Sequence, residues 1–534
     1  MMENTKIAVI EEENAFLKKQ NSDLAEQVRF LKEQVLILRQ MMFGRKSETK
    51  LEPPADNHQL TLFNEAEAER VPSLPEPEIE EITYKRKKRK GKREMDFSGL
   101  PVERVVHELP ESERVCPDCG NSLHACGHDV LRRELTVVPA QYKVTEHVQT
   151  VYSCRDCEKN EVDTPMVKAA VPTPVIKGSG VASPSLVAHV ANQKYTLAIP
   201  LYRQEQELKR NDINLSRQTM ANWLIHVSER LLAPVYVALK TLLVASEVLH
   251  ADETTVQVLK EEGKKPAAKS YMWLYRTSGD SERPIVLYEY QPNRKHENAK
   301  AFLSGFNGYL HSDGYGAYHN LPPGIVPVGC WAHVRRKFAD ILKSLPDYNK
   351  SDSIPMRGKE YCDALFAMER EFADLSFEER HQKRLERSKP VMDDFFAWAG
   401  ISQGSIFATP RSVAGKALAY ALGERKHLEN VLLDGRLDLS NNRAERSIKP
   451  FVIGRKNWLF ANTEKGATAS SVIYSVIETA KENGLKPYEY LKYIFETAPN
   501  IDLCCSEEIQ NLLPWNAPDV CRSEKQLTLG DVRE

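Results

Sequence analysis

Three acidic residues stand in settings suited to metal-dependent phosphoryl transfer. Asp252 closes the apolar run ASEVLHAD, and Asp313 closes a second run, FNGYLHSD. Both runs predict buried strands with a carboxylate at the carboxyl end, whereas Glu445 lies in NNRAERSIKP, which predicts the start of a helix. Carboxylates that converge from two strands and a helix can hold two divalent ions about 3.5–4 Å apart, and such a pair promotes attack on a phosphodiester.

Each acid also has a purely structural explanation. Asp252 can cap a turn after its strand, and Asp313 begins an Asp-Gly dipeptide that is common in turns. Asn442 and Glu445 have the spacing of a capping box, and Glu445 and Lys449 have that of an ion pair along a helix. The sequence contains 75 acidic residues, so the context of these three must support the choice.

The elements that must position these acids follow one another in a recognisable order. Apolar, β-rich runs predict strands at 246–252, 269–277, 283–290 and 307–313, a helix at 295–306, and a strand leading into a helix at 326–342. This order predicts a ribonuclease-H-like α/β catalytic domain with Asp252 on its first strand and Asp313 on its fourth. Residues from about 340 to 430 have helical patterns and predict an insertion before the helix of Glu445.

Paired cysteines upstream have the spacing of zinc ligands. Cys116 and Cys119 form one C-x-x-C pair, and Cys154 and Cys157 form a second one. Two such pairs can supply four thiolates to a structural Zn²⁺. The alternating sequence between them predicts a hairpin that brings the pairs together, although their separation of 34 residues is long for a zinc ribbon. Nearby alternative ligands are His124, Cys126 and His128.

The amino terminus has the pattern of a leucine zipper. Residues recur every seven positions at Ile10, Leu17, Leu24, Leu31 and Leu38, and a second series carries Asn and Val three positions before each leucine. Leu at d with Val and Asn at a favours a parallel homodimer. A single amphipathic helix packed on its own domain would give a similar pattern.

A linker with segregated charge follows the zipper. Residues 50–84 are rich in proline and weakly apolar, which is typical of a disordered segment, and residues 65–81 hold seven glutamates against one arginine. The basic run KRKKRKGKR begins directly afterwards at residue 85. Such a run can bind DNA phosphates without reading sequence, or it can be a solvated surface. The DNA-binding candidates in it are Lys85, Arg86, Lys87, Lys88, Arg89 and Lys90.

Three short helical patterns predict a helix-turn-helix-like segment. They cover about 184–192, 200–209 and 217–231, and Ser216 is a favourable N-cap for the third. Arg217, Gln218 and Asn222 would point outward on that helix, with side chains suited to phosphates or base edges. Ordinary helical packing would produce the same pattern.

Composition sets the broad class of the protein. The chain has 534 residues, a formal net charge of −2 and 41% hydrophobic residues, as expected of a globular protein with several domains. It contains no run of about 18 apolar residues and no secretory signal pattern, so we expect a cytoplasmic protein without a membrane partner.

Together these motifs resemble the DDE transposases of the insertion sequence 66 family over essentially the whole chain. The resemblance rests on the zipper running into MMFGRKSE, the paired cysteines, and the motifs HADETTVQV, SDGYGAY, GCWAHVRRKF, NNRAERSIKPFVIGRKNWLF and TAKENGLKPYEYLKYIF. It implies a DDE role for Asp252, Asp313 and Glu445 with two Mg²⁺ (or Mn²⁺) ions. It also implies binding to the terminal inverted repeats of the element, and accessory proteins encoded by the same element.

Four further residues are candidates near this site. Cys330 and His333 have the C-x-x-H spacing found after the second Asp in several DDE groups, but a buried cysteine beside an orienting histidine explains them equally well. Arg446 and Lys449 share the predicted helix of Glu445 and are candidates for contact with DNA phosphates.

The sequence therefore predicts a multidomain α/β transposase that cleaves element ends and joins them to target DNA. A noncatalytic, zipper-dimerised DNA-binding regulator and a structure-selective nuclease of the same fold are the alternatives. The expected domains are a coiled coil (1–45), a linker (46–97), a zinc-binding module (98–175), the helix-turn-helix-like segment (176–235), the catalytic domain (236–470) and a helical C-terminal segment (471–515).

Overall fold

The computed structural model describes residues 140–155, 166–318, 321–345, 353–403, 405 and 408–522, with isolated residues before 125. Apart from Lys18 and Gln20, the predicted zipper lies outside the described residues, as do the linker with Lys85–Lys90 and the cysteines Cys116, Cys119 and Cys157. The chain divides into two units, residues 45–171 and residues 172–534 together with 1–44. Each unit is considered by itself.

The smaller unit contains a short antiparallel hairpin. Strand β1 (Val151–Ser153) pairs with β2 (Met166–Lys168), with Val151 opposite Lys168. Cys154 follows β1 directly and is exposed, so the second cysteine pair begins the loop of this hairpin. The hairpin expected between the two cysteine pairs falls mostly outside the described residues; of residues 140–153, which are described, only Val151–Ser153 form a strand.

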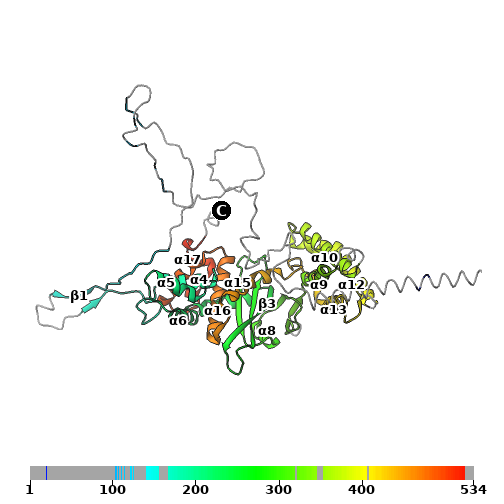
Figure 1. The fold of residues 1–534 in the computed structure, drawn as a ribbon, viewed down its shortest axis with the longest axis horizontal. Coiled ribbons are helices and arrows are strands. Elements are labelled where there is room, and N and C mark those ends of the chain that lie inside the picture. Colours follow the sequence, from blue (N-terminus) through cyan, green and yellow to red (C-terminus); the bar gives the residue numbers. More distant parts are fainter. Residues whose placement is uncertain are drawn as a thin grey trace, which may run out of the picture. The chain divides into compact units, whose positions relative to one another are not determined.

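The larger unit is built around a mixed sheet (Figure 1). Three consecutive antiparallel strands are β3 (Val248–Lys260), β4 (Lys269–Thr277) and β5 (Val286–Gln291). Helix α8 (His296–Phe302) then leads to β6 (Gly308–His311), followed by β7 (Ile325–Val328), and both strands run parallel to β3. The order across the sheet is β5-β4-β3-β6-β7, and β8 (Ala461–Thr463) pairs with the far end of β3. The five strands and the helix predicted from apolar, β-branched and aromatic runs are confirmed.

Asp252 does not end its strand, contrary to the expectation from sequence. It is the fifth of the 13 residues of β3, which continues to Lys260 because it keeps pairing with β4. The parallel pairing of β3 with β6, by contrast, ends close to Asp252: the last pair of residues is His250 and His311. The β3 backbone is therefore open toward the β6 side at the level of Asp252.

Two helices pack on different parts of the sheet. Helix α15 (Asn442–Trp458) packs on β3, and α16 (Glu464–Glu482) runs along the edge strand β5. The hydroxyls of Ser475 and Thr479 accept hydrogen bonds from the amides of Tyr288 (2.7 Å) and Val286 (3.0 Å). This edge of the sheet is therefore closed by side chains of a helix, which prevents further strand pairing there.

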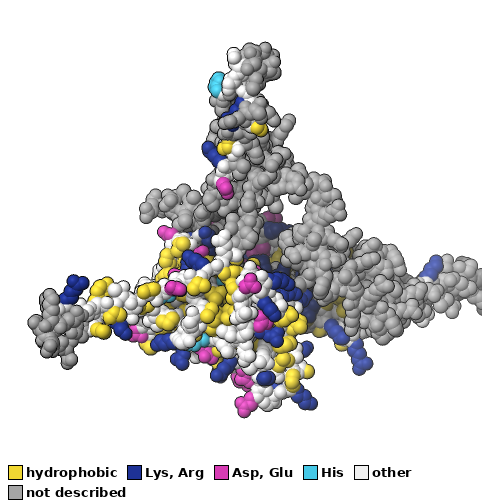
Figure 2. All heavy atoms as spheres, turned by 60° about the vertical axis from the view of Figure 1, so that its left-hand side comes forward, with side chains coloured by type: hydrophobic (Ala, Val, Ile, Leu, Met, Phe, Trp, Pro, Cys, Tyr) yellow, Lys and Arg dark blue, Asp and Glu magenta, His cyan; other side chains and the backbone are white. Residues whose placement is uncertain are grey.

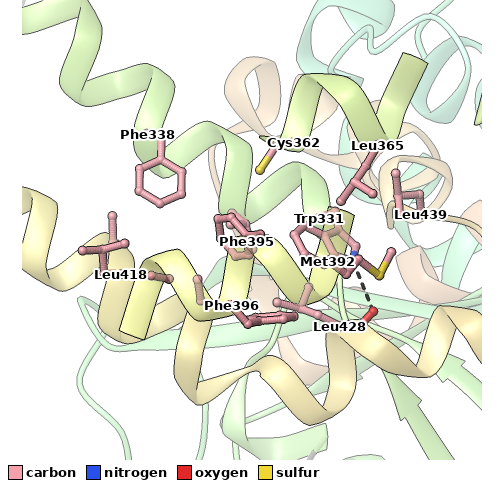
Figure 3. Packing of buried hydrophobic residues seen from close by; sticks show 14 of the residues in the cluster. Trp331, Phe338, Cys362, Leu365, Met392, Phe395, Phe396, Leu418, Leu428 and Leu439 are labelled. Carbon is pink, nitrogen blue, oxygen red and sulfur yellow. Dashed lines mark hydrogen bonds between the residues drawn. The ribbon is translucent and has the colours of Figure 1, made fainter. Parts of the chain in front are cut away.

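The predicted helical insertion is present and has its own core. It comprises α10 (Ile354–Glu371), α11 (Phe377–Lys383), α12 (Lys389–Gln403), α13 (Val413–Gly423) and α14 (Arg425–Glu429), and the preceding helix α9 (Trp331–Ser344) packs into the same core. Figure 3 shows Trp331, Phe338, Phe395 and Phe396 packed together at its centre. The indole of Trp331 also donates to the carbonyl of Leu428 (3.1 Å), which fastens the start of α9 to the end of the insertion.

The helix-turn-helix-like segment forms the three predicted helices, α4 (Pro184–Tyr195), α5 (Leu201–Arg210) and α6 (Arg217–Val227). Ser216 caps α6, since its hydroxyl accepts from the amide of Thr219 (3.1 Å). A π-helical turn (Ser228–Leu232) joins α6 to α7 (Ala233–Val244), so the three helices continue into α7 without a break and belong to the same unit as the sheet.

The carboxy-terminal segment packs back onto the same unit. Gly484 has a φ of 70° and ends α16, and Pro487 opens α17 (Pro487–Thr497), as their positions in the sequence predict. Helix α17 lies against α4, and the short α18 (Ser506–Asn511) follows. No helix in the described part of the chain has the length and apolar character to cross a membrane.

Candidate active site

Asp252 and Asp313 each follow a buried histidine on neighbouring parallel strands. His250 and His311 are paired in register, and their rings stack with centroids 4.3 Å apart. Side chains two positions apart on a strand share a face, so Asp252 lies on the same face of β3 as His250. Asp313 comes two residues after His311, just beyond the end of β6. The parallel register therefore brings both acids to the same edge of the sheet.

The turn that carries Asp313 is held from two sides. Its carboxylate accepts from the amide of Tyr315 (3.0 Å), so the turn predicted as a structural alternative is formed. Tyr420, on α13 of the helical insertion, donates its hydroxyl to the carbonyl of Asp313 (2.7 Å). Gly314 has a φ of 83°, and a Cβ there would lie 2.9 Å from the Tyr420 oxygen. Glycine therefore allows the insertion to approach this turn.

Glu445 lies in the first turn of α15, as predicted, and its partners come from α9. Its carboxylate accepts from the guanidinium of Arg336 (3.0 Å) and lies 3.6 Å from Nε2 of His333. The capping box that Asn442 suggested is not formed, because Asn441 is the N-cap residue and makes no side-chain capping hydrogen bond. The side chain of Glu445 is 30% exposed and faces charged groups rather than the helix end.

Asn441 joins the three elements of the site and was not identified from the sequence. Its side-chain amide donates to the carbonyl of Ala251 (2.8 Å), where β6 no longer pairs with β3, and its side-chain oxygen lies 3.0 Å from Nδ1 of His250. Its backbone amide donates to the sulfur of Cys330 (3.1 Å), the N-cap residue of α9. Asn441 is fully buried, so these bonds fix the start of α15 against β3 and α9.

The acids interact electrostatically across this junction. Burial raises the pKa of Asp252 well above its ordinary value, and the charges of Glu253, Asp313 and Glu445 raise it further. Its carboxylate also accepts from the amide of Glu253 (2.8 Å), which acts in the opposite direction. Since β3 continues past Asp252, the explanation of Asp252 as the cap of a turn is wrong. A carboxylate at this position adds a negative charge to the group of acids formed by Glu253, Asp313 and Glu445.

Glu253 is a fourth acid beside this cluster. Its side chain is almost fully buried and pairs with the guanidinium of Arg294, and Tyr318 donates its hydroxyl to it (2.5 Å). The ring of Tyr315 lies under Arg294, with the guanidinium carbon 3.5 Å from the ring centroid. Burial raises the pKa of Glu253, although Tyr318 and Arg294 oppose this rise. Its position next to Asp252 is the only signal for this residue that can be read from the sequence.

Cys330 and His333 have different surroundings. Cys330 is buried, and burial raises the pKa of its thiol to about 11, so it is held as a neutral thiol. His333 is 22% exposed and faces Glu445, while burial lowers its pKa against the opposing effect of Glu445. Cys330 is therefore part of the buried core, whereas His333 lies beside Glu445.

The donor chemistry of the cluster fits Mg²⁺ or Mn²⁺. Asp252, Asp313 and Glu445 offer only carboxylate oxygens, which these hard cations prefer, and the raised pKa of Asp252 is the shift that a bound cation would reverse. Among the described residues no group of three or more His, Cys, Asp or Glu side chains is already gathered as a metal site. The bond from Arg336 to Glu445 accounts for part of this, because it directs that carboxylate toward α9.

The candidate DNA-binding residues within the described chain are accessible. Arg217, Gln218 and Asn222 are exposed on α6, whose apolar face is buried as predicted. On α15, Arg446 is exposed and Lys449 is half-buried. The histidine pair was missed, although the repeated pattern Leu-His-x-Asp at 249–252 and 310–313 could have indicated it.

Comparison with known proteins agrees with this architecture. Residues 179–469 match the Transposase IS66 family, which spans the sheet, the helical insertion and all three acids. Three further matches are the zinc-finger binding domain of transposase IS66 (113–158), the IS66 C-terminal element (475–515) and a region described as Transposase C of IS166 homeodomain (30–105). The matches to several modules of one transposase family indicate the class of DNA transposases. The chain belongs to the IS66 transposase family.

Its relatives among curated proteins come from Sinorhizobium fredii (strain NBRC 101917 / NGR234). The uncharacterized protein y4hP is 31% identical over 431 residues, which cover 77% of this chain and 74% of the relative. The uncharacterized protein y4qI is 32% identical over 77% of this chain and 75% of its own length. The similarity therefore extends over most of both chains.

Proposed function

We propose that this protein is a DDE transposase that cleaves DNA at the inverted repeats of its element and transfers the freed ends into target DNA. The proposal rests on the junction of three elements that carry the predicted acids: His250 and His311 pair in register two residues before Asp252 and Asp313, and Asn441, at the start of the Glu445 helix, donates to the carbonyl of Ala251 (2.8 Å). The direction of the Asp252 pKa, which the charges of Asp313 and Glu445 raise, supports the same proximity. The strand order β5-β4-β3-β6-β7, with three antiparallel strands followed by two parallel ones, supports a ribonuclease-H-like domain.

Asp252, Asp313 and Glu445 would hold two Mg²⁺ or Mn²⁺ ions. When bound, these ions supply Lewis-acid stabilisation for the oxygens that enter and leave the phosphorus. Glu445 must turn from Arg336 toward the other acids, and its 30% exposure leaves room for this rotation. Arg336 would then be released to bind a phosphate oxygen of the DNA.

The chain's own residues organise two in-line displacements at this place. In the first, water attacks the phosphodiester at the element end and a 3′-hydroxyl leaves; in the second, that 3′-hydroxyl attacks a target phosphodiester. No protein side chain needs to form a bond to phosphorus in either displacement. Asn441 keeps the Glu445 helix against the Asp252 strand, so the acids need little rearrangement between the two reactions.

Zinc and DNA binding by the upstream segments belong to the same proposal. The match to the IS66 zinc finger supports a structural Zn²⁺ held by Cys116, Cys119, Cys154 and Cys157. The zipper would pair two subunits so that both element ends are held in one assembly, and accessory proteins of the element are further candidate partners.

The test is a cleavage and joining assay with the full-length protein, Mg²⁺ and DNA that contains the element ends. We expect nicking and strand-transfer products from the wild type, and a loss of at least about 10³-fold with Asp252→Asn. Asp363→Asn, an acid on the surface of the helical insertion, is the matched control and should retain activity. Binding without nicking by the wild type would favour a regulator, and cutting of branched DNA without joining would favour a nuclease.

A further inference from the structure

The turn that ends α15 has an unusual backbone. Leu459 has φ 67° and ψ −53°, and the amide of Phe460 donates to the carbonyl of Trp458 (2.9 Å). These are the features of a γ-turn with positive φ, a form that is rare and strained, especially around a residue other than glycine. Strained backbone persists where the surrounding structure enforces it, and it is concentrated at functional positions.

This turn displays apolar side chains to solvent. Leu459 is 63% exposed and Phe460 is 43% exposed. Asn457, just before the turn, donates its side-chain amide to the carbonyl of Ala198 (3.1 Å), another residue with positive φ, and the adjacent Leu197 is 56% exposed. Two strained turns, from α15 and from the α4–α5 connection, are thus joined, and both present apolar groups. Exposed apolar side chains also occur across the face in Figure 2, so exposure alone does not mark a binding surface.

A row of cations leads from Glu445 toward this turn. Arg446, Lys449 and Lys456 are spaced by three and seven residues, which places them along one face of α15 between Glu445 and the turn. Lys194 does not belong to this row, because its ammonium packs 5.3 Å from the ring centroids of both Tyr195 and Trp458 and burial lowers its pKa to about 8. The row begins at the acidic site and ends at the exposed Leu459 and Phe460. Its cations suit the phosphates of DNA and the apolar side chains suit its bases, and a protein surface would match this combination less well.

Glu464 and Arg455, which lie close to the turn in the sequence, already have hydrogen-bond partners within the protein. Glu464, in the first turn of α16, accepts from the amide of Glu262 (3.0 Å). The guanidinium of Arg455 bonds to the hydroxyls of Thr254 and Thr255 on β3 (both 3.1 Å), which anchors the last turns of α15 to the sheet. The turn with Leu459 and Phe460 is therefore held in place by the contacts of α15 with the sheet.

We propose that Leu459 and Phe460 form an apolar wedge that enters the base stack of DNA bound along α15. This inference rests on the proposed function, because the DNA must lie with its scissile phosphate near Glu445. Apolar side chains that enter a base step unstack and kink the duplex. Leu459 is 14 residues from Glu445, or about 21 Å along the helix, and at about 3.4 Å per nucleotide the wedge meets the duplex about six base pairs from the cleaved bond.

Base unstacking can be measured directly with 2-aminopurine, whose fluorescence rises when it leaves the stack. We expect full-length wild-type protein to raise the fluorescence of a probe about six base pairs from the cleavage position, but not of one about 15 base pairs away. The double variant Leu459→Gly, Phe460→Ala should abolish the rise. Glycine accepts positive φ, so the variant also relieves backbone strain and should fold. Ile401→Ala, at an exposed apolar residue of the helical insertion, is the control and should retain the rise.

Cleavage of mismatched DNA provides the second measurement. The double variant should cleave matched end DNA about tenfold more slowly, and a mismatch at the wedge position should restore its rate, because the base pair is already open. If wild type cleaves but no probe responds, or if the mismatch restores nothing, the wedge is refuted while the transposase proposal stands. If the probe responds as expected but no cleavage occurs, the wedge stands and the catalytic proposal fails.

Discussion

At the scale of single residues, the site places several negative charges close together around a buried carboxylate. Asp252 is surrounded by Glu253, Asp313 and Glu445, and its pKa is raised by burial and by these three charges. The cations that the structure supplies, Arg294 and Arg336, bind Glu253 and Glu445 rather than Asp252. Among the described residues Asp252 therefore combines deep burial and three acidic neighbours with no ion pair of its own.

This arrangement predicts a stability cost that the unliganded protein carries at neutral pH. A carboxyl whose folded pKa is raised binds its proton more tightly in the folded state, so stability falls as pH rises from about 3.9 toward the folded pKa. Asp252→Asn removes that loss. Its unfolding temperature in a chelator at pH 7.5 should exceed that of wild type, and its free energy of unfolding should be higher by about 1.4 kcal/mol for each unit by which folding raises the pKa of Asp252.

The control for this measurement is an acid with the opposite shift. Hydrogen bonds from Lys359 and Arg335 lower the pKa of Asp363 although burial opposes them, so this acid stabilises the fold above its unfolded pKa and the benefit is lost as pH falls. Asp363→Asn should therefore lower the unfolding temperature slightly at pH 7.5. A lower unfolding temperature for Asp252→Asn as well would contradict the charge argument.

At the scale of elements, the sequence predicted what local patterns determine. Runs such as KSYMWLYRT and RPIVLYEY have the β-branched and aromatic residues of strands, and both form them. The end of β3 was placed too early, at Asp252, although the run TTVQVLK at 254–260 has the β-branched alternation of a strand and its Val256 and Val258 are buried. Pairing with β4 and β8 carries the strand past the charged residues Asp252 and Glu253, where the apolar pattern is interrupted. Asn441 was missed because its partners Ala251 and Cys330 are distant in sequence.

The junction made by Asn441 is an element-scale feature that can be tested. Asn441→Ala leaves the Ala251 carbonyl and His250 without their partner, and we expect a loss of about 2–4 kcal/mol in unfolding free energy. Because the start of α15 is loosened, cleavage should fall by much more than DNA binding does. Asn442→Ala, at the next position, should change neither quantity, since the capping box is not formed. Equal losses in both variants would show that the helix start as a whole matters, rather than this bond.

The helical insertion supports the Asp313 turn through Tyr420. Tyr420→Phe removes the donor to the Asp313 carbonyl, which costs about 0.5–1.5 kcal/mol, and should slow cleavage several-fold at limiting Mg²⁺. Saturating Mg²⁺ should restore most of the rate, because the bound cation can hold the turn in place. Tyr361→Phe is the matched control, since that ring packs on Phe395 and Trp398 inside the insertion. An unchanged dependence on Mg²⁺ in Tyr420→Phe would separate the insertion from the site.

At the scale of the whole molecule, the near-zero net charge hides a strong separation of charge along the chain. The total is −2, yet residues 65–81 hold seven glutamates and the run from Lys85 to Arg93 holds eight cations. The catalytic unit adds its own cationic row on α15 beside an acidic centre. Nonspecific and positional contacts with DNA are therefore expected from different parts of the chain.

The salt dependence of DNA binding should distinguish these contributions. Replacing the six residues from Lys85 to Lys90 with serine should lower the slope of log affinity against log salt by up to about 5, since each phosphate contact contributes about 0.9.

Deleting residues 65–81 should instead tighten nonspecific binding at low salt, because the glutamates then no longer compete with DNA for the basic run. Filter binding or fluorescence anisotropy from about 50 to 200 mM salt measures both effects. An unchanged slope in the serine variant would assign the phosphate contacts to the catalytic unit, and unchanged affinity in the deletion variant would refute the competition between the two charged segments.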